Sequence, residues 1–230
     1  LIPMLHDEEP SVRAAAAEAL AAIGPAAEEG IELLVEAAMR EDNKPLRLQA
    51  VCALGAVARR ADYVVYVIPH LLHVLRSTKE ELQRAAIRSL GALGTDAAVE
   101  RLVELLTDVD GDTAEEAALA LGAIGPDARA AVPALLRMLR AGGYRPAGAA
   151  YALGRIGKVD DAIVPALLQA LQHPVPDVRE EAAIALRAIA PELVANLPDL
   201  HATPPEEQRI RPQHAAGIAV RSARFTLGDY

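Results

Sequence analysis

The chain has 230 residues, of which 52% are hydrophobic, and its aromatic residues are five Tyr and one Phe, with no Trp. This composition excludes intrinsic disorder, and the single Cys52 excludes an intrachain disulfide scaffold. A net charge of −9 argues against nucleic acid as a ligand, because binding to phosphates requires a basic face. No uninterrupted apolar run of about 18 residues occurs, so we expect no membrane-spanning helix.

One helical pattern recurs along the chain. A leucine preceded by Ala or Ser is followed three residues later by an aliphatic residue, usually with Gly next. These marker leucines are Leu20, Leu54, Leu90, Leu121, Leu153 and Leu186, and they are separated by 34, 36, 31, 32 and 33 residues. Upstream of each marker, apolar residues follow the spacing of one buried helix face, as at Ile68, Leu71, Leu72 and Leu75. Each unit is therefore predicted to be a helix A, a polar turn, a helix B and a short link.

Prolines occur at equivalent positions in four of the predicted A helices. Pro3, Pro69, Pro133 and Pro165 each follow the first apolar residue of an A-helix pattern. Proline is tolerated in the first helical turn, so these residues predict helix starts. Because neither helix of a unit can bury its apolar stripe alone, stacking of units must complete the core. The fold class predicted is all-α, an α-α superhelix.

The first unit carries a resemblance to a known family. The turn at 7–13, Asp-Glu-Glu-Pro-Ser-Val-Arg, precedes an alanine-rich helix that ends in Ile23-Gly24. This pattern resembles the short bacterial HEAT-like repeat of the PBS-lyase type. The resemblance implies a HEAT-repeat solenoid of about six helical hairpins with a degenerate C-terminal cap. The predicted repeats are 1–27, 28–63, 64–96, 97–128, 129–160 and 161–195, and 196–230 would form the degenerate seventh repeat and tail.

The cysteine content and the first residues bear on the location of the protein in the cell. The lone cysteine suits a reducing cytosol, so we expect a cytoplasmic protein, and the resemblance to the short bacterial repeat implies a bacterial source. Because Leu1 falls inside the first predicted helix, the natural chain is expected to continue upstream, which leaves its targeting open.

Several groups of residues resemble metal or catalytic sites but lack residues that such sites require. The acidic run 108–112 opens like a calcium loop, but Thr113 stands where the glycine is needed and Leu119 where the bidentate Glu is needed. His70 and His73 are three residues apart on one helix with no third ligand nearby. Cys52 has no His or Asp placed beside it by the repeat geometry. We therefore expect no metal, no cofactor and no catalytic residue.

Two enzyme classes with HEAT-like repeats were compared with the chain. Deoxyhypusine hydroxylases hold iron with His-Glu pairs six and five positions before the marker leucine. The corresponding pairs contain no His; they are Ala14-Ala15, Leu48-Gln49, Arg84-Ala85, Glu115-Glu116, Ala147-Gly148 and Glu180-Glu181. HEAT-like DNA glycosylases need a basic concave face and aromatic residues, which this composition disfavours. The chain is thus predicted not to be an enzyme.

A row of arginines and one glycine pair bear on the joints between units. Arg13, Arg47 and Arg179 stand seven residues before their marker leucines. The resemblance implies that they pair with turn acids of the adjacent repeat, in a ladder that breaks at Gln83, Ala114 and Pro146. Gly142-Gly143 replaces the acidic turn of the fifth unit and predicts the most deformable joint. Whether this joint is a hinge or drift stays open.

The B helices also carry an outward stripe. Positions six before, two before and two after each marker share one helix face. Along this stripe, apolar residues alternate with arginines, a composition typical of protein-binding hot spots. The predicted partner-binding residues are Arg84, Arg88, Leu119, Tyr151, Arg155, Leu48 and Ile184. The alternative is a phase error of one residue, which would place part of the stripe in the core.

The predicted function is a non-catalytic scaffold that binds a protein or peptide on the concave face of the B helices. The resemblance leaves two alternatives: a chromophore-handling protein similar to phycobilin lyases, or a regulatory module of a larger enzyme. The sequence predicts neither the identity of the partner nor the oligomeric state.

Overall fold

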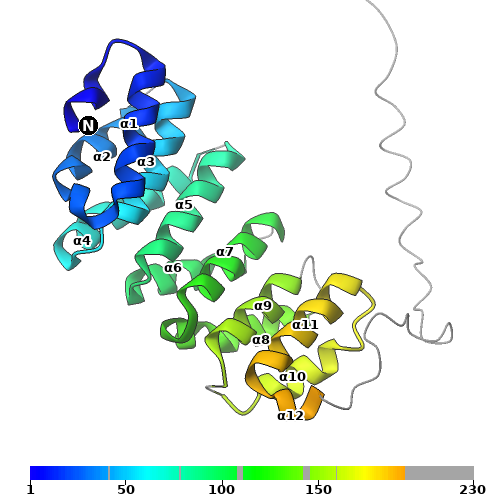
Figure 1. Cartoon of the computed structure of the whole chain (residues 1–230). Helices are drawn as coiled ribbons and strands as arrows, with labels where there is room; N and C mark the ends of the chain where they lie inside the picture. The colour runs from blue at the N-terminus through cyan, green and yellow to red at the C-terminus, as the bar shows by residue number, and fades with distance from the viewer. Residues whose placement is uncertain (41, 78, 108–110, 142–145, 159, 195–230) are drawn as a thin grey trace, which may run out of the picture.

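The computed structural model describes residues 1–40, 42–77, 79–107, 111–141, 146–158 and 160–194. In this part of the chain every regular element is a helix. The helices form an elongated stack of two layers that runs from the N-terminus to the short helix α12 (Pro191–Val194) (Figure 1). This arrangement confirms the predicted all-α superhelix.

One layer contains the B helices, which carry the marker leucines. They are α1 (Pro10–Ile23), α3 (Lys44–Val57), α5 (Glu80–Leu93), α7 (Gly111–Ile124), α9 (Ala147–Ile156) and α11 (Pro176–Ile189). Each B helix contacts the next one along the chain. All six marker leucines are at most 2% exposed, so every B helix turns the same face of its pattern into the core.

The other layer contains the A helices. They are η1 (Ile2–His6), α2 (Ile31–Arg40), α4 (Ala61–Leu75), α6 (Asp96–Leu105), α8 (Val132–Arg140) and α10 (Ile163–Ala170). Two 3₁₀ links, η2 (Gly24–Gly30) and η3 (Gly125–Ala131), lead from a B helix into the next A helix. The predicted repeat boundaries 63/64 and 96/97 fall inside α4 and α6, because both helices begin earlier than their apolar spacing suggests.

Pro69 is not at a helix start, and that prediction is wrong. It lies in the interior of α4, which begins at Ala61. The segment before Pro69 is helical because Val64 and Val67 bury their side chains in the core, at 5% and 0% exposure. This burial compensates for the hydrogen bond that proline cannot donate to the carbonyl of Val65. The helix is thereby extended by two turns toward its N-terminus.

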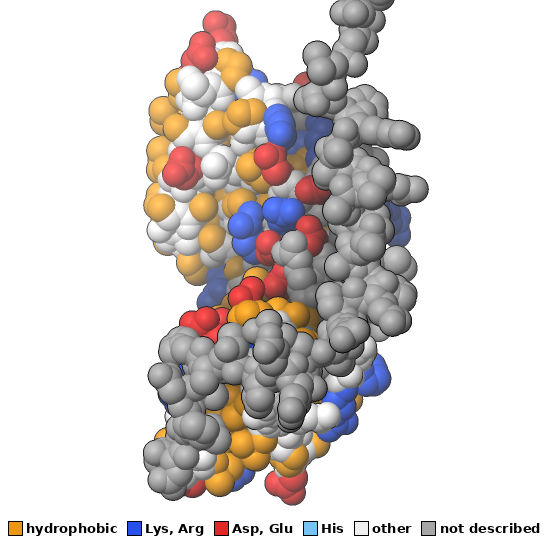
Figure 2. All heavy atoms as spheres, turned by 90° about the vertical axis from the view of Figure 1, so that its right-hand side faces the viewer, with side chains coloured by type: hydrophobic (Ala, Val, Ile, Leu, Met, Phe, Trp, Pro, Cys, Tyr) orange, Lys and Arg blue, Asp and Glu red, His pale blue; other side chains and the backbone are white. Residues whose placement is uncertain are grey.

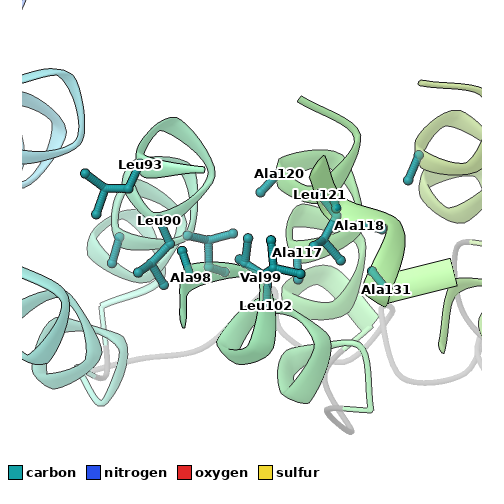
Figure 3. Packing of buried hydrophobic residues seen from close by; sticks show 14 of the residues in the cluster. Leu90, Leu93, Ala98, Val99, Leu102, Ala117, Ala118, Ala120, Leu121 and Ala131 are labelled. Atoms are coloured by element: carbon teal, nitrogen blue, oxygen red, sulfur yellow. The ribbon is translucent and has the colours of Figure 1, made fainter. Parts of the chain in front are cut away.

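The core lies between the two layers. Figure 3 shows Val99 and Leu102 of α6 between Leu90 of α5 and Leu121 of α7. All four side chains are at most 2% exposed. Helix α6 therefore buries its apolar face against two successive B helices, which ties its repeat to the next one.

The B helices approach one another closely at glycines that follow the marker leucine. A Cβ added at Gly55 would lie 2.6 Å from Cα of Ser89, and one at Gly154 would lie 2.5 Å from Cβ of Ala185. At Gly55, Gly91 and Gly154 the facing residue is small and one position before the next marker, whereas Gly122 faces the ring of Tyr151 as well as Ala152. The B helices also contact one another more extensively than the A helices do, so the B layer is the more tightly packed of the two.

The arginines of the predicted ladder also hold the turn of their own repeat, and their pairing with turn acids of the adjacent repeat stays a prediction. Their guanidinium groups donate hydrogen bonds to main-chain carbonyls at that turn. These bonds are Arg13 Nη1 to Asp7 O (2.9 Å) and Glu8 O (3.1 Å), Arg47 Nε to Ala38 O (2.9 Å), and Arg179 Nη1 to His173 O (2.9 Å) and Pro174 O (3.1 Å). Gln83 continues the pattern with a bond from Nε2 to Leu75 O (3.2 Å). These side chains close the A–B turn, since the end of helix A presents unsatisfied carbonyls there.

Three predicted features lie outside the described residues. They are the start of the acidic run at 108–110, the Gly142-Gly143 joint and the degenerate repeat at 196–230.

One helical stretch, Gly111–Arg140, is long and apolar enough to cross a membrane by length and composition alone. It consists of α7, η3 and α8 and turns at Gly125, where φ is 75°. Of its most apolar window, 56% is buried, and Leu121 and Leu135 are fully buried in the solenoid. The apolar character of this stretch is that of core helices, so it is weak evidence for a span.

Candidate partner-binding surface

The outward stripe of the B helices lies outside the core. In each of the six B helices, all three stripe positions are exposed or half-buried. The residues three and four positions before each marker are buried instead, as at Ala86 and Ile87 of α5. The alternative of a one-residue phase error is therefore wrong. Figure 2 shows Lys and Arg side chains gathered beside Asp and Glu side chains near the middle of this side of the molecule.

A pocket of about 630 Å³ opens on this face between the C-terminal halves of α5 and α7. We call it the α5–α7 pocket. Its walls are Arg59, Arg88, Gly91, Ala92, Leu93, Gly94, Glu116, Leu119, Ala120, Ala123, Ile124 and Asp127. The small residues Gly91 and Ala120 form its floor, because they are the point at which the two helices touch: a Cβ on Gly91 would lie 2.9 Å from Cβ of Ala120.

The pocket combines mixed charge with apolar surface. Arg59 donates from Nη1 to the carbonyl of Ala92 and so joins the end of the second repeat to α5. Arg88 is exposed and, within the described part of the chain, forms no hydrogen bond or ion pair. Leu119 is 39% exposed although it is a large apolar residue. An unpaired guanidinium beside an exposed aliphatic side chain can receive a carboxylate and an apolar group together.

Two of the predicted binding residues make contacts between repeats. Arg84 forms ion pairs with Glu80 (3.4 Å) and Asp112 (4.0 Å), and the second pair links α5 to the start of α7. The ring of Tyr151 lies against Gly122 of α7, since a Cβ there would be 2.6 Å from Tyr151 Cε1. Arg84 and Tyr151 thus flank the α5–α7 pocket but do not line it.

The remaining predicted residues are spread along the row. Arg155 is exposed at the end of α9, and its carbonyl is 3.7 Å from a Cβ placed on Gly125. Leu48 is half-buried on α3 and packs against the core. Ile184 is 48% exposed on α11. The structure therefore brings Arg88 and Leu119 into one pocket and leaves the other five around it or further along the stack.

Sequence reasoning missed three charged residues of the pocket. Arg59 and Asp127 lie in the links after α3 and α7, outside the helical stripe, and Glu116 lies one position beside it. The sequence carried a signal for Arg59 and Asp127. Both residues follow the last turn of a B helix, in the link that leads to the next repeat.

Cys52 lies near Arg88 and provides a measurable probe of the pocket. Burial raises the pKa of the half-buried Cys52 thiol, and the positive charge of Arg88 opposes this by a smaller amount. We expect the pH–rate profile of Cys52 alkylation to be shifted to higher pH than that of a free thiol. Replacement of Arg88 by Ala should shift it further in the same direction, because the cation that stabilises the thiolate is removed. A shift to lower pH in Arg88→Ala would contradict this placement of the two side chains.

The candidate metal ligands do not converge among the described residues. No group of three or more His, Cys, Asp and Glu side chains there could hold a metal ion. Nδ1 of His70 lies 2.8 Å from the carbonyl of Tyr66, and the two rings are 5.0 Å apart, while His73 is exposed.

Comparison with family models places the chain. A model of HEAT repeats matches residues 1–63 and 68–154, and a single HEAT repeat matches residues 163–193. The chain belongs to the HEAT-repeat family. A PBS lyase HEAT-like repeat also matches, over residues 147–173. Among curated proteins, none is significantly similar to this HEAT-repeat chain.

Solved structures share the fold of this HEAT-repeat chain. An engineered protein from the Northeast Structural Genomics Consortium is 26% identical, with a TM-score of 0.52 over 81% of this chain and 94% of that one. A second engineered protein is 27% identical, with a TM-score of 0.51 over 82% and 57%. The complex of CpcE and CpcF of phycocyanin lyase from Nostoc sp. PCC7120 is 27% identical, with a TM-score of 0.55 over 71% and 66%.

Proposed function

We propose that this HEAT-repeat protein is a non-catalytic scaffold that binds a protein or peptide partner on the concave B-helix face, with the α5–α7 pocket at the centre of the contact. The observation that carries the proposal is the combination, in one pocket, of the unpaired Arg88 and the 39% exposed Leu119. Arginine beside exposed apolar surface is typical of binding hot spots.

The chemistry of the pocket defines the kind of partner. Arg88 would pair with a carboxylate, while Leu119 and Ile124 would cover an aliphatic or aromatic side chain next to it. Glu116 and Asp127 also line the pocket, and their negative charges would disfavour a polyanion such as nucleic acid. A peptide segment with an acidic residue close to an apolar one fits this arrangement, and the flanking residues Arg84, Tyr151 and Arg155 would extend the contact along the row.

The test compares two double variants with the same chemistry. Arg88→Glu/Leu119→Asp alters the pocket, and Arg137→Glu/Leu168→Asp makes equivalent changes on the A helices, where Leu168 is 37% exposed. Each protein is immobilised, partners are captured from source-cell lysate, and captured peptides are resynthesised for titration. We expect the wild type and the A-helix variant to bind one peptide equally and the pocket variant to bind it at least about tenfold more weakly. Equal affinity of all three proteins would move the site away from the pocket.

A second candidate function is chromophore handling, as in a lyase-like protein, while a regulatory module of a larger enzyme stays a separate prediction. Its support is the PBS lyase HEAT-like repeat at residues 147–173 and the likeness to the CpcE–CpcF complex. Addition of a bilin to the purified protein separates the two functions. A scaffold leaves the absorption spectrum of the bilin unchanged, whereas a chromophore-binding protein shifts it.

A further inference from the structure

The outer side of α4 is unlike that of the two neighbouring A helices, α2 and α6. Seven residues with helical spacing occupy it, and we call them the α4 outer face; they are Asp62, Val65, Tyr66, Pro69, Leu72, His73 and Arg76. Val65 is 74% exposed and Tyr66 is 43% exposed, and only Leu72 of the seven is half-buried. Figure 1 shows α4 in the A layer, where its other side packs against α5.

The neighbouring A helices are polar at the corresponding places. The exposed positions of α2 include Glu32 and Glu36, and those of α6 include Glu100 and Glu104. The outer face of α4 is apolar along its centre and charged only at its two ends. Contiguous apolar surface rimmed by polar residues marks an interaction site.

We propose that the α4 outer face is a homodimer interface, at which a second copy of the chain packs its own α4 antiparallel about a twofold axis next to Pro69. This surface is separate from the α5–α7 pocket, and the proposal does not depend on the proposed function.

A second copy of the chain fits this surface because the residues of the α4 outer face are complementary to one another about a twofold axis. A twofold axis at Pro69 places Val65 opposite His73 of the second copy and Tyr66 opposite Leu72 of the second copy. The same symmetry places Asp62 opposite Arg76 of the second copy, and this pair occurs twice, as an isologous interface requires. The apolar residues meet in the middle, and opposite charges meet at both ends.

The charged ends are available for such pairing. Asp62 is 87% exposed in its side chain, and its contact with Arg60 is long, at 3.8 Å. Arg76 is exposed and forms no ion pair within the described part of the chain. Antiparallel packing also brings the negative end of each helix dipole to the positive end of the other. A parallel arrangement would instead place the two Asp62 carboxylates at the same end.

The interface is small and the dimer is accordingly weak. One pair of helices buries less than the roughly 1,200 Å² that stable interfaces reach, so association is expected at micromolar to submillimolar concentration.

The first experiment measures the average mass of the full chain in solution, for the wild type and for variants in which the charges of the α4 outer face are changed. Sedimentation equilibrium of the wild type from about 1 µM to about 500 µM should show the average mass rising toward that of a dimer. Asp62→Arg should raise the dissociation constant about tenfold, because two ion pairs become two repulsions, and Asp62→Arg/Arg76→Asp should restore it. Val65→Glu should abolish the rise while the circular dichroism spectrum stays unchanged.

The second experiment tests the register. In a Cys52→Ser background, a mixture of Val65→Cys and His73→Cys proteins should form a disulfide-linked heterodimer faster than either protein links to itself. A mixture of Val65→Cys with Glu100→Cys on α6 is the control and should link slowly. A wild type that stays monomeric, a charge swap that fails to restore association, or linking no faster than in the control would overturn the proposal. Binding of the monomer to lipid vesicles or to a different protein through Val65 would overturn it as well.

Discussion

Replacement of Gly154 by Ala is expected to lower the free energy of unfolding by about 1–3 kcal/mol. The added Cβ would lie 2.5 Å from Cβ and 2.7 Å from Cα of Ala185, so the new methyl group meets the backbone of α11 and no side chain can rotate to make room. The α9–α11 contact must open, and the loss is felt along the stack because each repeat is stabilised mainly by its neighbours. Urea denaturation followed by circular dichroism measures the change.

Gly30→Ala is the matched control for this substitution. Its Cβ would have its nearest contact at 3.4 Å, with a side-chain carbon of Leu20, which is ordinary van der Waals distance. We expect Gly30→Ala to be neutral or slightly stabilising, because Ala restricts the unfolded chain. If Gly154→Ala were as stable as this control, the B helices would have to be less tightly apposed than the structure has them.

Replacement of Arg179 by Ala is expected to cost about 2 kcal/mol, since two charge-assisted hydrogen bonds are lost. The guanidinium is only 8% exposed and its Nη1 holds the carbonyls of His173 and Pro174 at the turn between α10 and α11. Without it, these carbonyls must find water and the turn loosens. The cost can be measured from the midpoint of thermal or urea unfolding.

The pKa of His173 is a second readout, which distinguishes the loss of the Arg179 hydrogen bonds at the turn from a general loss of stability. Burial lowers the pKa of His173, and the charge of Arg179 lowers it further. In Arg179→Ala the pKa of His173 should therefore rise, which NMR titration of the imidazole can follow. Arg187→Ala on the same helix is the control: Arg187 is exposed, so its loss should change stability by less than about 0.5 kcal/mol and leave His173 unchanged. An equal effect of the two substitutions would refute the role of Arg179.

Both residues bear on function through the geometry of the B-helix face. The glycine contacts set the spacing between B helices, and the arginine and glutamine bonds set the turn that precedes four of them, α1, α3, α5 and α11. The α5–α7 pocket exists because Gly91 and Ala120 touch while the longer side chains of Arg88 and Leu119 rise on either side. A partner that reads several repeats at once would depend on this spacing.

Much of the architecture could be predicted from the sequence by itself. The marker leucines and the i, i+3, i+4, i+7 spacing report which face of each helix is buried, and this is a local property of the chain. The same phase predicted a stripe whose positions are all exposed or half-buried, because a residue two positions from a buried leucine lies on a different face of the helix. The all-α superhelix followed from the repetition of this pattern, and the family was indicated by the resemblance of the first unit to a known repeat.

Only the tertiary structure decided what depends on the relation between one repeat and the next. Periodicity does not contain the rotation between repeats, so it could not show that Arg59 and Asp127 from two links join Arg88 in one pocket. Nor could it show that Arg84 is held by Asp112 of the following B helix. The interior position of Pro69 was decided in the same way, because burial of Val64 and Val67 against neighbouring helices outweighs the local preference of proline for a helix start.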